Sequence, residues 1–140
     1  MTLKKIVSLL KIVMKIAYDL SCSAFGLSQK GLDLYNKKRT EAGLSTVADN
    51  FDLREKDRHD PHLIEVIEEL GAEANDWSHL KIKEAPRSYE KFYTVKTLQG
   101  GKERVIFKPV KLMKERLNGR NIDELTEEEC RTLLKDLYQF

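Results

Sequence analysis

The first candidate binding residues of this chain lie at a turn near residue 25. Ser23-Ala24-Phe25-Gly26 leads into a predicted helix for which Ser28 makes a good N-terminal cap. A helix N-terminus presents unpaired N–H groups and partial positive charge, which suit a phosphate or a carboxylate. Phe25, Gly26 and Ser28 are therefore candidate ligand-binding residues. No Walker or dinucleotide-binding motif is present, so a plain capped connection with Phe25 in the core is the favoured interpretation.

A second candidate lies in the charged stretch Arg58-His59-Asp60. Arg58 could bind an anion together with the turn, or it could pair with Asp60. Asp60 precedes Pro61 at the clearest helix start in the chain, since an aspartate cap followed by proline is typical of a helix N-terminus. A structural role for this stretch is therefore favoured over a binding role.

Catalytic and metal sites are not predicted, and we expect no cofactor. Serine, histidine and aspartate all occur, but no nucleophile elbow or cysteine–histidine signature surrounds them. His59 and His62 are three residues apart but straddle a helix start, and a zinc ion would need further ligands from His79, Cys22 or Cys130. The sequence therefore favours a protein that is not an enzyme.

Composition indicates a globular, cytoplasmic protein. Of its 140 residues, 41% are hydrophobic and 34% are charged, a mix that can bury a core beneath a heavily charged surface. Two cysteines in a chain rich in lysine and glutamate are typical of a reduced compartment. The net charge of +2 is small, basic residues are dispersed and aromatic residues are not interleaved with them, so nucleic acid is not an expected partner.

The elements that must position these residues follow from hydrophobic spacing and from turn signals. We expect a strand over 15–22, a helix over 29–38, a loop over 40–57 that could include a short strand near Phe51, and a helix over 61–70 that Gly71 could end. Strands at 80–85, 91–98 and 103–108 follow, the last two joined by a turn at Gly100-Gly101. Two helices complete the chain. Asn118-Gly119 ends the first, and Thr126 and Glu129 have the spacing of a capping box at the start of the second.

This order predicts an α+β protein with a small antiparallel or mixed sheet of three to five strands and helices packed on one face. Three parts are expected: an amphipathic N-terminal extension at 1–13, a core domain at 14–108 and a C-terminal helical extension at 109–140. The extension at 1–13 has a basic face and an apolar face that includes Leu10. It could pack on its own domain or a partner subunit, lie on an acidic membrane surface, or precede a second start site at Met14, and packing is favoured.

Three stretches stand out as motifs. They are the turn Phe25-Gly26-Leu27-Ser28, the helix Asp60-Pro61-His62-Leu63 to Glu68-Glu69-Leu70-Gly71 with Arg58 before it, and the strand Leu80-Lys81-Ile82-Lys83-Glu84-Ala85-Pro86. These motifs resemble an uncharacterised family of small proteins from bacteriophages, large DNA viruses and some bacteria, and the resemblance covers about residues 14–108. It implies the fold and a viral or phage setting, in the host cytoplasm or the virion, but no particular activity.

The leading functional hypothesis is a non-enzymatic interaction or structural accessory protein that binds a protein partner or a second copy of itself. The residues expected to bind the partner are exposed apolar candidates on the end segments and one loop: Leu10, Trp77, Leu134 and Tyr138. Trp77 could equally be a lid over the core. The alternatives are a small-molecule or nucleotide-sequestering protein that uses Phe25-Gly26 and Arg58, and an uncharacterised hydrolase.

Overall fold

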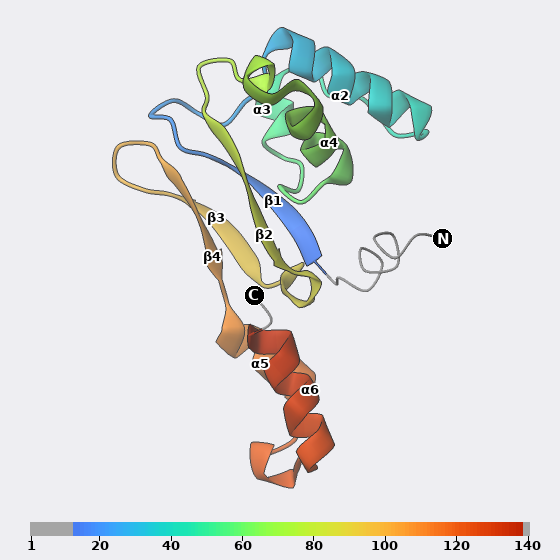
Figure 1. Cartoon of the computed structure of the whole chain (residues 1–140), viewed down its shortest axis with the longest axis vertical. Coiled ribbons are helices and arrows are strands. Elements are labelled where there is room, and N and C mark those ends of the chain that lie inside the picture. The colour runs from blue at the N-terminus through green and yellow to red at the C-terminus, as the bar shows by residue number, and fades with distance from the viewer. Residues whose placement is uncertain (1–12, 139–140) are drawn as a thin grey trace. The chain divides into compact units, whose positions relative to one another are not determined.

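The computed structural model describes residues 13–138 and belongs to the α+β class (Figure 1). Within these residues four strands form two separate two-stranded antiparallel sheets, β1 (Val13–Asp19) with β2 (Leu80–Pro86) and β3 (Tyr93–Thr97) with β4 (Glu103–Phe107). The single sheet of three to five strands expected from the sequence is not confirmed. Leu10 and the rest of the predicted N-terminal extension up to residue 12 lie outside the described residues.

Five α-helices and three short 3-10 helices complete the described part of the chain. The α-helices are α2 (Gln29–Glu41), α3 (Asn50–Leu53), α4 (Pro61–Leu70), α5 (Pro109–Leu117) and α6 (Glu127–Tyr138). The 3-10 helices are η1 (Gly71–Ala74), η2 (Arg87–Tyr89) and η3 (Ile122–Glu124). None of the helices described is long and apolar enough to cross a lipid bilayer.

The chain divides into two compact units. The larger unit consists of residues 15–83 and 95–105, and the C-terminal unit consists, among the described residues, of 13–14, 84–94 and 106–138. The three-part division at residues 14 and 108 stays a prediction.

The core of the larger unit lies where α2 and α4 meet β1 and β2 (Figure 1). Leu63, Ile64, Val66 and Ile67 of α4 are all buried, in the i, i+3, i+4 spacing that keeps side chains on one side of a helix. Burial of each such side chain is worth about 1.5–3 kcal/mol. This stripe therefore fixes α4 in place.

Helix boundaries follow the signals expected from the sequence. The Ser28 side chain accepts a hydrogen bond from Gly31 N at the start of α2, and the Asp60 side chain accepts one from His62 N at the start of α4, with Pro61 next to it. Gly71, with φ of 55°, ends α4. A positive φ carries little steric penalty for glycine, which is why the helix ends there.

The outer face of α4 is acidic and is neutralised locally. Glu68 pairs with Lys15 at 3.0 Å, and Lys38 lies 3.2 Å from Glu65 and 2.7 Å from Glu69. These hydrogen bonds, that of Glu69 first, raise the pKa of Lys38. Basic residues near the front of the chain therefore have partners on α4.

Two details of the larger unit differ from the sequence predictions. The short strand near Phe51 is wrong, because Asp49 caps a helix there, α3, and Phe51 is exposed. The strand expected over 15–22 is β1 (Val13–Asp19), and it does not bury alternate residues as a half-buried strand would, because the neighbours Ile16 and Ala17 are both fully buried. Asp19 is buried as well, and hydrogen bonds compensate for its removal from water.

The C-terminal unit is a helical hairpin packed on η2 (Figure 1). Asn118 and Gly119, with φ of 48° and 82°, end α5 as the sequence predicts. The predicted capping box is formed: Glu129 N donates to Thr126 Oγ1 at 3.1 Å, and Thr126 N donates to Glu129 Oε1 at 3.2 Å. Tyr89 of η2 donates its hydroxyl hydrogen to Leu137 O at 2.7 Å, and this bond fixes the end of α6 to η2.

Candidate functional site

The turn expected to bind a ligand is held by side chains from α3. Asn50 gives Leu27 two hydrogen bonds: its Oδ1 accepts from Leu27 N at 2.8 Å, and its Nδ2 donates to Leu27 O at 3.0 Å. Arg54 Nε donates to Phe25 O at 2.8 Å. Ser78 Oγ, from the loop before β2, donates to Gly26 O at 2.7 Å. The backbone polar groups of the turn are therefore used internally, which fixes its conformation.

Ser28 is engaged on both sides. Its hydroxyl accepts from Gly31 N and donates to Glu73 O at 2.6 Å, and its own N–H donates to Ala74 O at 2.8 Å. Carbonyl groups of η1 thus lie at the start of α2, where an anion would have to approach. Ser28 and Gly26 do not line the pocket described below, whereas Phe25 and Arg58 do.

Phe25 and Arg58 do come together. The Arg58 guanidinium carbon lies 3.7 Å from the centroid of the Phe25 ring, close enough for a cation–π interaction. Arg58 also forms a two-pronged ion pair with Glu103, with Nη1–Oε1 at 2.7 Å and Nη2–Oε2 at 2.9 Å. The two side chains are only 14% and 8% exposed. The pairing of Arg58 with Asp60 that the sequence allowed is replaced by this one.

Asp60 has different partners. Tyr35 donates its hydroxyl hydrogen to Asp60 Oδ2 at 2.6 Å, and Arg39 Nη1 lies 3.5 Å from the same oxygen. Burial, followed by the hydrogen bond and charge of Asp60, raises the pKa of Tyr35. Asp60 therefore joins α2 to the start of α4 besides capping α4.

A pocket of about 380 Å³ opens beside the turn, and we call it the turn pocket. Its lining includes Ser23, Phe25, Arg54, Arg58, Thr97 and Glu103. Glu103 neutralises Arg58, whereas Arg54 has no carboxylate partner among residues 13–138 and is exposed. The turn pocket thus offers a ligand one unneutralised cation, Arg54, and the hydroxyl groups of Ser23 and Thr97, whereas the Phe25 ring is buried beneath Arg58.

A buried polar network supports the turn pocket. Asp19, which is fully buried, accepts hydrogen bonds from Ser21 N, Ser21 Oγ and His79 N at 2.7–2.9 Å. Its own N–H donates to Glu103 Oε1 at 2.8 Å. Glu103 therefore receives hydrogen bonds from two chain segments and holds them together.

Sequence reasoning missed both Asp19 and Glu103. Glu103 lies on a strand of alternating residues, two residues from buried Val105, and that spacing is the signal that could have identified it. Asp19 lies two residues from buried Ala17, but Ile16 is buried as well, so alternation along β1 does not show which face is buried.

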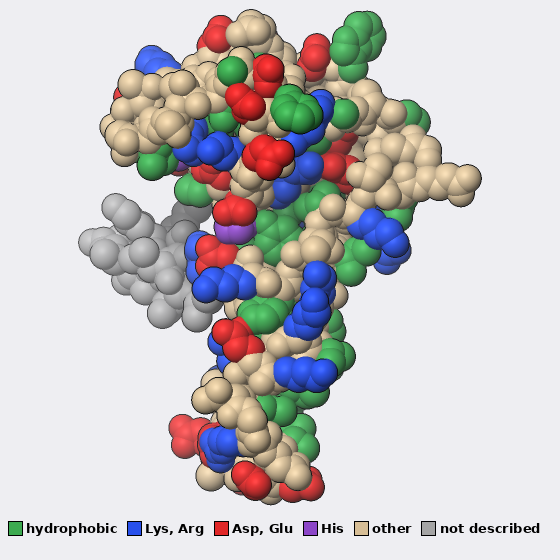
Figure 2. Space-filling model, turned by 180° about the vertical axis from the view of Figure 1, so that it is seen from behind, with side chains coloured by type: hydrophobic (Ala, Val, Ile, Leu, Met, Phe, Trp, Pro, Cys, Tyr) green, Lys and Arg blue, Asp and Glu red, His purple; other side chains and the backbone are tan. Residues whose placement is uncertain are grey.

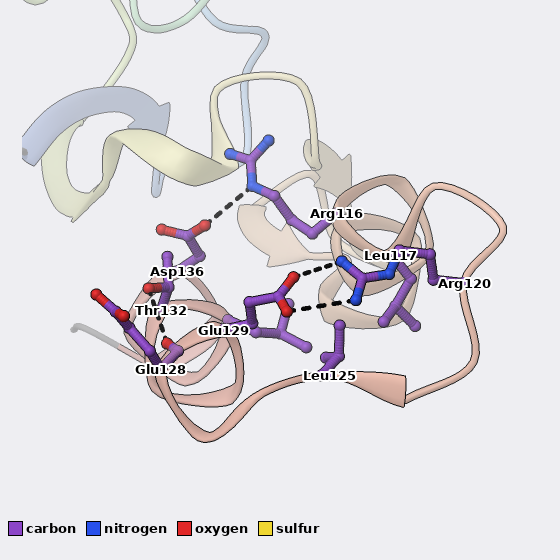
Figure 3. Close-up of a pocket in the computed structure, with 9 residues that line it drawn as sticks. Arg116, Leu117, Arg120, Leu125, Glu128, Glu129, Thr132 and Asp136 are labelled. Carbon is purple, nitrogen blue, oxygen red and sulfur yellow. Dashed lines mark hydrogen bonds and ion pairs between the residues drawn. The ribbon is translucent and has the colours of Figure 1, made fainter. Parts of the chain in front are cut away.

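The C-terminal unit contains a second pocket, of about 330 Å³, between α5 and α6 (Figure 3). Leu117, Leu125 and Leu133 supply its apolar lining. Ion pairs lie beside them: Arg116 Nε is 2.9 Å from Asp136 Oδ2, and Arg120 binds Glu129 with both terminal nitrogens. The Arg120 guanidinium, followed by the Thr126 backbone N–H, lowers the pKa of Glu129 to about 2.

Three of the four predicted partner-binding residues can be placed, and all three are exposed. Leu134 and Tyr138 are 56% and 68% exposed, one turn apart on α6, and Trp77 is 85% exposed on the loop before β2. On the adjoining side of α6, Leu133 and Leu137 are buried. Trp77 is not a lid over the core, because its side chain is in solvent.

Residues 13–138 contain no group of three histidine, cysteine, aspartate or glutamate side chains that could hold a metal ion. Cys22 is exposed and Cys130 is partly exposed, and both are free thiols.

Comparison of the chain with models of protein families, with curated protein sequences and with solved structures found no match.

Proposed function

We propose that this protein is a non-enzymatic interaction protein that binds a protein partner through the exposed apolar stripe of α6. The observation that carries the proposal is the exposure of Leu134 and Tyr138 beside a stripe, Leu133 and Leu137, that the fold already buries. A helix in water normally has one apolar face, turned to its core. A second stripe is typical of a helix that also packs on something else.

Exposed apolar residues are also frequent elsewhere in the C-terminal unit. Four of the eight large hydrophobic side chains exposed in the described part of the chain lie in residues 109–138: Val110, Ile122, Leu134 and Tyr138. Figure 2 shows hydrophobic side chains along one edge of these helices. Tyr138 adds a hydroxyl group to the stripe, and tyrosine is enriched where interfaces bury an aromatic ring.

A binding role also fits the charges near the pockets. The guanidinium groups of Arg58, Arg116 and Arg120 are each held by a carboxylate of the same chain. Paired groups of this kind stabilise a fold but are poorly placed to move protons for a substrate. A viral or phage setting, in the host cytoplasm or the virion, is proposed on the sequence resemblance alone.

The test uses the full chain and two variants with the same change in charge. Leu134→Glu with Tyr138→Glu puts two carboxylates on the stripe, and Lys135→Glu changes the charge equally on the polar side of α6. Sedimentation equilibrium first asks whether the partner is a second copy. If so, the wild type and Lys135→Glu dimerise and the double variant does not.

If the wild type is a monomer, the proposed partner is a different protein, and a capture experiment tests for it. Immobilised wild type, Lys135→Glu and double variant are compared for proteins captured from cells in which the chain is naturally made. The proposal predicts a protein retained by the first two and lost by the third. Equal capture by all three, or none by any, contradicts it.

A second candidate function is the binding of a small anionic molecule, such as a nucleotide, in the turn pocket. It is favoured by the exposed, unneutralised Arg54 next to Phe25 and Arg58. A ligand at 100 times its dissociation constant stabilises a protein by about 2.7 kcal/mol, which a thermal-shift screen detects. Arg54→Gln should abolish the shift, and Lys37→Gln, an exposed cation on α2, should leave it intact.

A further inference from the structure

The outward face of the β3–β4 hairpin carries a cluster of cations that have no ion-pair partner among residues 13–138. Leu98 N donates to Lys102 O at 2.7 Å, and Lys108 N donates to Phe92 O at 2.8 Å at the other end of the strands. This register places Lys96 opposite Arg104. Since side chains alternate along a strand, Lys96, Lys102 and Arg104 share one face, which we call the basic ribbon.

Burial confirms which face this is. Glu103 and Val105 are buried on one face, whereas Lys96, Lys102 and Arg104 are all exposed. Glu103 is the only carboxylate in residues 95–105, and Arg58 holds it on the buried face. The basic ribbon therefore has three positive charges and no negative one. Lys and Arg side chains stand out from the hairpin in Figure 2.

These cations differ from several others in the larger unit, which have carboxylate partners. Lys15, Lys30 and Lys38 each pair with a glutamate, and Arg39 pairs with Asp60. Among residues 13–138 no carboxylate pairs with any cation of the basic ribbon. Like charges directly opposite each other on two strands are destabilising, so this arrangement costs the hairpin stability.

Its geometry fits a row of phosphates. Side chains directly opposite on paired strands are about 5 Å apart at Cβ and diagonal ones about 7 Å, so three long cationic side chains project from a small area. A two-stranded ribbon also fits the major groove of duplex DNA, which is about 12 Å wide. We infer that the basic ribbon binds the phosphate backbone of a nucleic acid duplex, independently of base sequence.

The same face argues against other polyanions. It carries no aromatic side chain on which the bases of a single strand could stack. Leu98, 40% exposed, is the one large apolar side chain at this end of the hairpin. That is too little to insert into a bilayer or to form pockets for an acidic peptide. The sequence had argued against nucleic acid because basic residues are dispersed along the chain, but pairing of β3 with β4 brings three of them together.

The test is the salt dependence of binding to a short duplex DNA, followed by fluorescence anisotropy with the full chain. Three phosphate contacts predict a slope of about −2.7 for log K against log salt, a loss of about 40-fold between about 50 and 200 mM salt. The variant Lys96→Gln, Lys102→Gln, Arg104→Gln should bind at least about tenfold more weakly at the lower salt, with a slope near zero.

Two further variants test whether binding depends on the position of the cations or only on the net charge of the protein. Lys37→Gln, Lys56→Gln, Lys135→Gln removes the same charge from helices and a loop, and it should bind like the wild type. Lys96→Arg with Lys102→Arg keeps the charge and should also bind. Circular dichroism melting confirms that each variant is folded, and removal of the facing cations should leave the hairpin at least as stable.

Three results would overturn the inference. One is no binding of duplex by the wild type at the lower salt. Another is an equal loss in the two triple glutamine variants, which would make the effect one of net charge alone. The third is binding of polyglutamate or of phosphatidylserine vesicles, lost in the first triple variant, with no binding of duplex.

Discussion

The guanidinium group of Arg58 lies on the face of the Phe25 ring, 3.7 Å from its centroid, while two of its nitrogens hold Glu103, 45 residues further along the chain. Arg58 O also accepts a hydrogen bond from Ala17 N at 2.8 Å. One residue thus connects β1, the turn and β4. Because its partners come from separate parts of the sequence, the pair fixes the geometry of the turn pocket.

Loss of either partner of this pair should destabilise the larger unit strongly. Arg58→Ala or Glu103→Ala leaves a poorly solvated charge alone, and such a change typically costs about 3–5 kcal/mol. We expect about 3 kcal/mol in urea unfolding, because both side chains keep slight contact with water. Arg131→Ala is the control, since its pair with Glu127 is 70% and 82% exposed and should contribute at most about 0.5 kcal/mol. Similar costs for the two sites would contradict the structure.

The hairpin tip offers a matched pair of glycines. Gly100 and Gly101 have φ of 95° and 96°, but a Cβ on Gly101 would lie 2.7 Å from Cys22 O, whereas one on Gly100 would meet nothing within 4 Å. Gly100→Ala should therefore cost only backbone strain, about 1 kcal/mol, and Gly101→Ala at least about 1 kcal/mol more. Denaturant midpoints measure both. If the two variants were equally stable, the approach of the tip to Cys22 would be wrong.

The ion pair between Arg120 and Glu129 should persist in acid at pH values at which an ordinary glutamate is already protonated. The pKa of Glu129 is lowered from 4.5 to about 2. The stability that ionised Glu129 contributes to the fold is therefore complete above about pH 4.5 and is lost as pH falls through about 2. Carboxyl-carbon NMR titration should find this midpoint. Arg120→Gln should raise it more than Thr126→Ala does, because Arg120 is the larger cause and Thr126→Ala removes only the hydroxyl and keeps the backbone N–H. The reverse order would reject that assignment.

Tyr35 should resist ionisation in alkali. Burial first, then Asp60, raises its pKa above the ordinary value of 10.0. Because the pKa is raised in the fold, the stability that protonated Tyr35 contributes is present below about pH 10 and is lost as pH rises further. The tyrosinate absorbance of the wild type, compared with that of Tyr35→Phe, isolates this residue. Asp60→Asn should lower the pKa of Tyr35 only in part, because burial remains; a full return to 10.0 would show that burial is not the main cause.

Signals that act within a few residues were predictable from the sequence. Ser28, Asp60 and Thr126 each cap a helix by bonding an N–H two or three residues ahead, so residue type and spacing suffice. The partners of Arg58 were not predictable in this way. Asp60 was the near candidate, but Glu103 became the partner when the hairpin packed on the turn, a consequence of tertiary structure.

Sheet organisation was the other part that local signals did not decide. The hairpin of β3 and β4 was predictable because Gly100-Gly101 allows the positive φ of a tight turn. The pairing of β1 with β2 joins residues about sixty positions apart, for example through Leu20 N and His79 O. Alternating residues predict a strand but do not name its neighbour, and so the number of strands per sheet stayed open.

The amide of Asn50 does for Leu27 what a neighbouring strand would do, since it both donates to and accepts from one backbone unit. A carboxamide carries its acceptor oxygen and its donor NH₂ group on one carbon, as this pairing with a peptide unit needs. Hydrolysis to aspartate, the common spontaneous damage to asparagine, would set a carboxylate oxygen against Leu27 O, where two acceptors repel. Deamidation of this one partly buried side chain would therefore loosen the turn without any change in the apolar core.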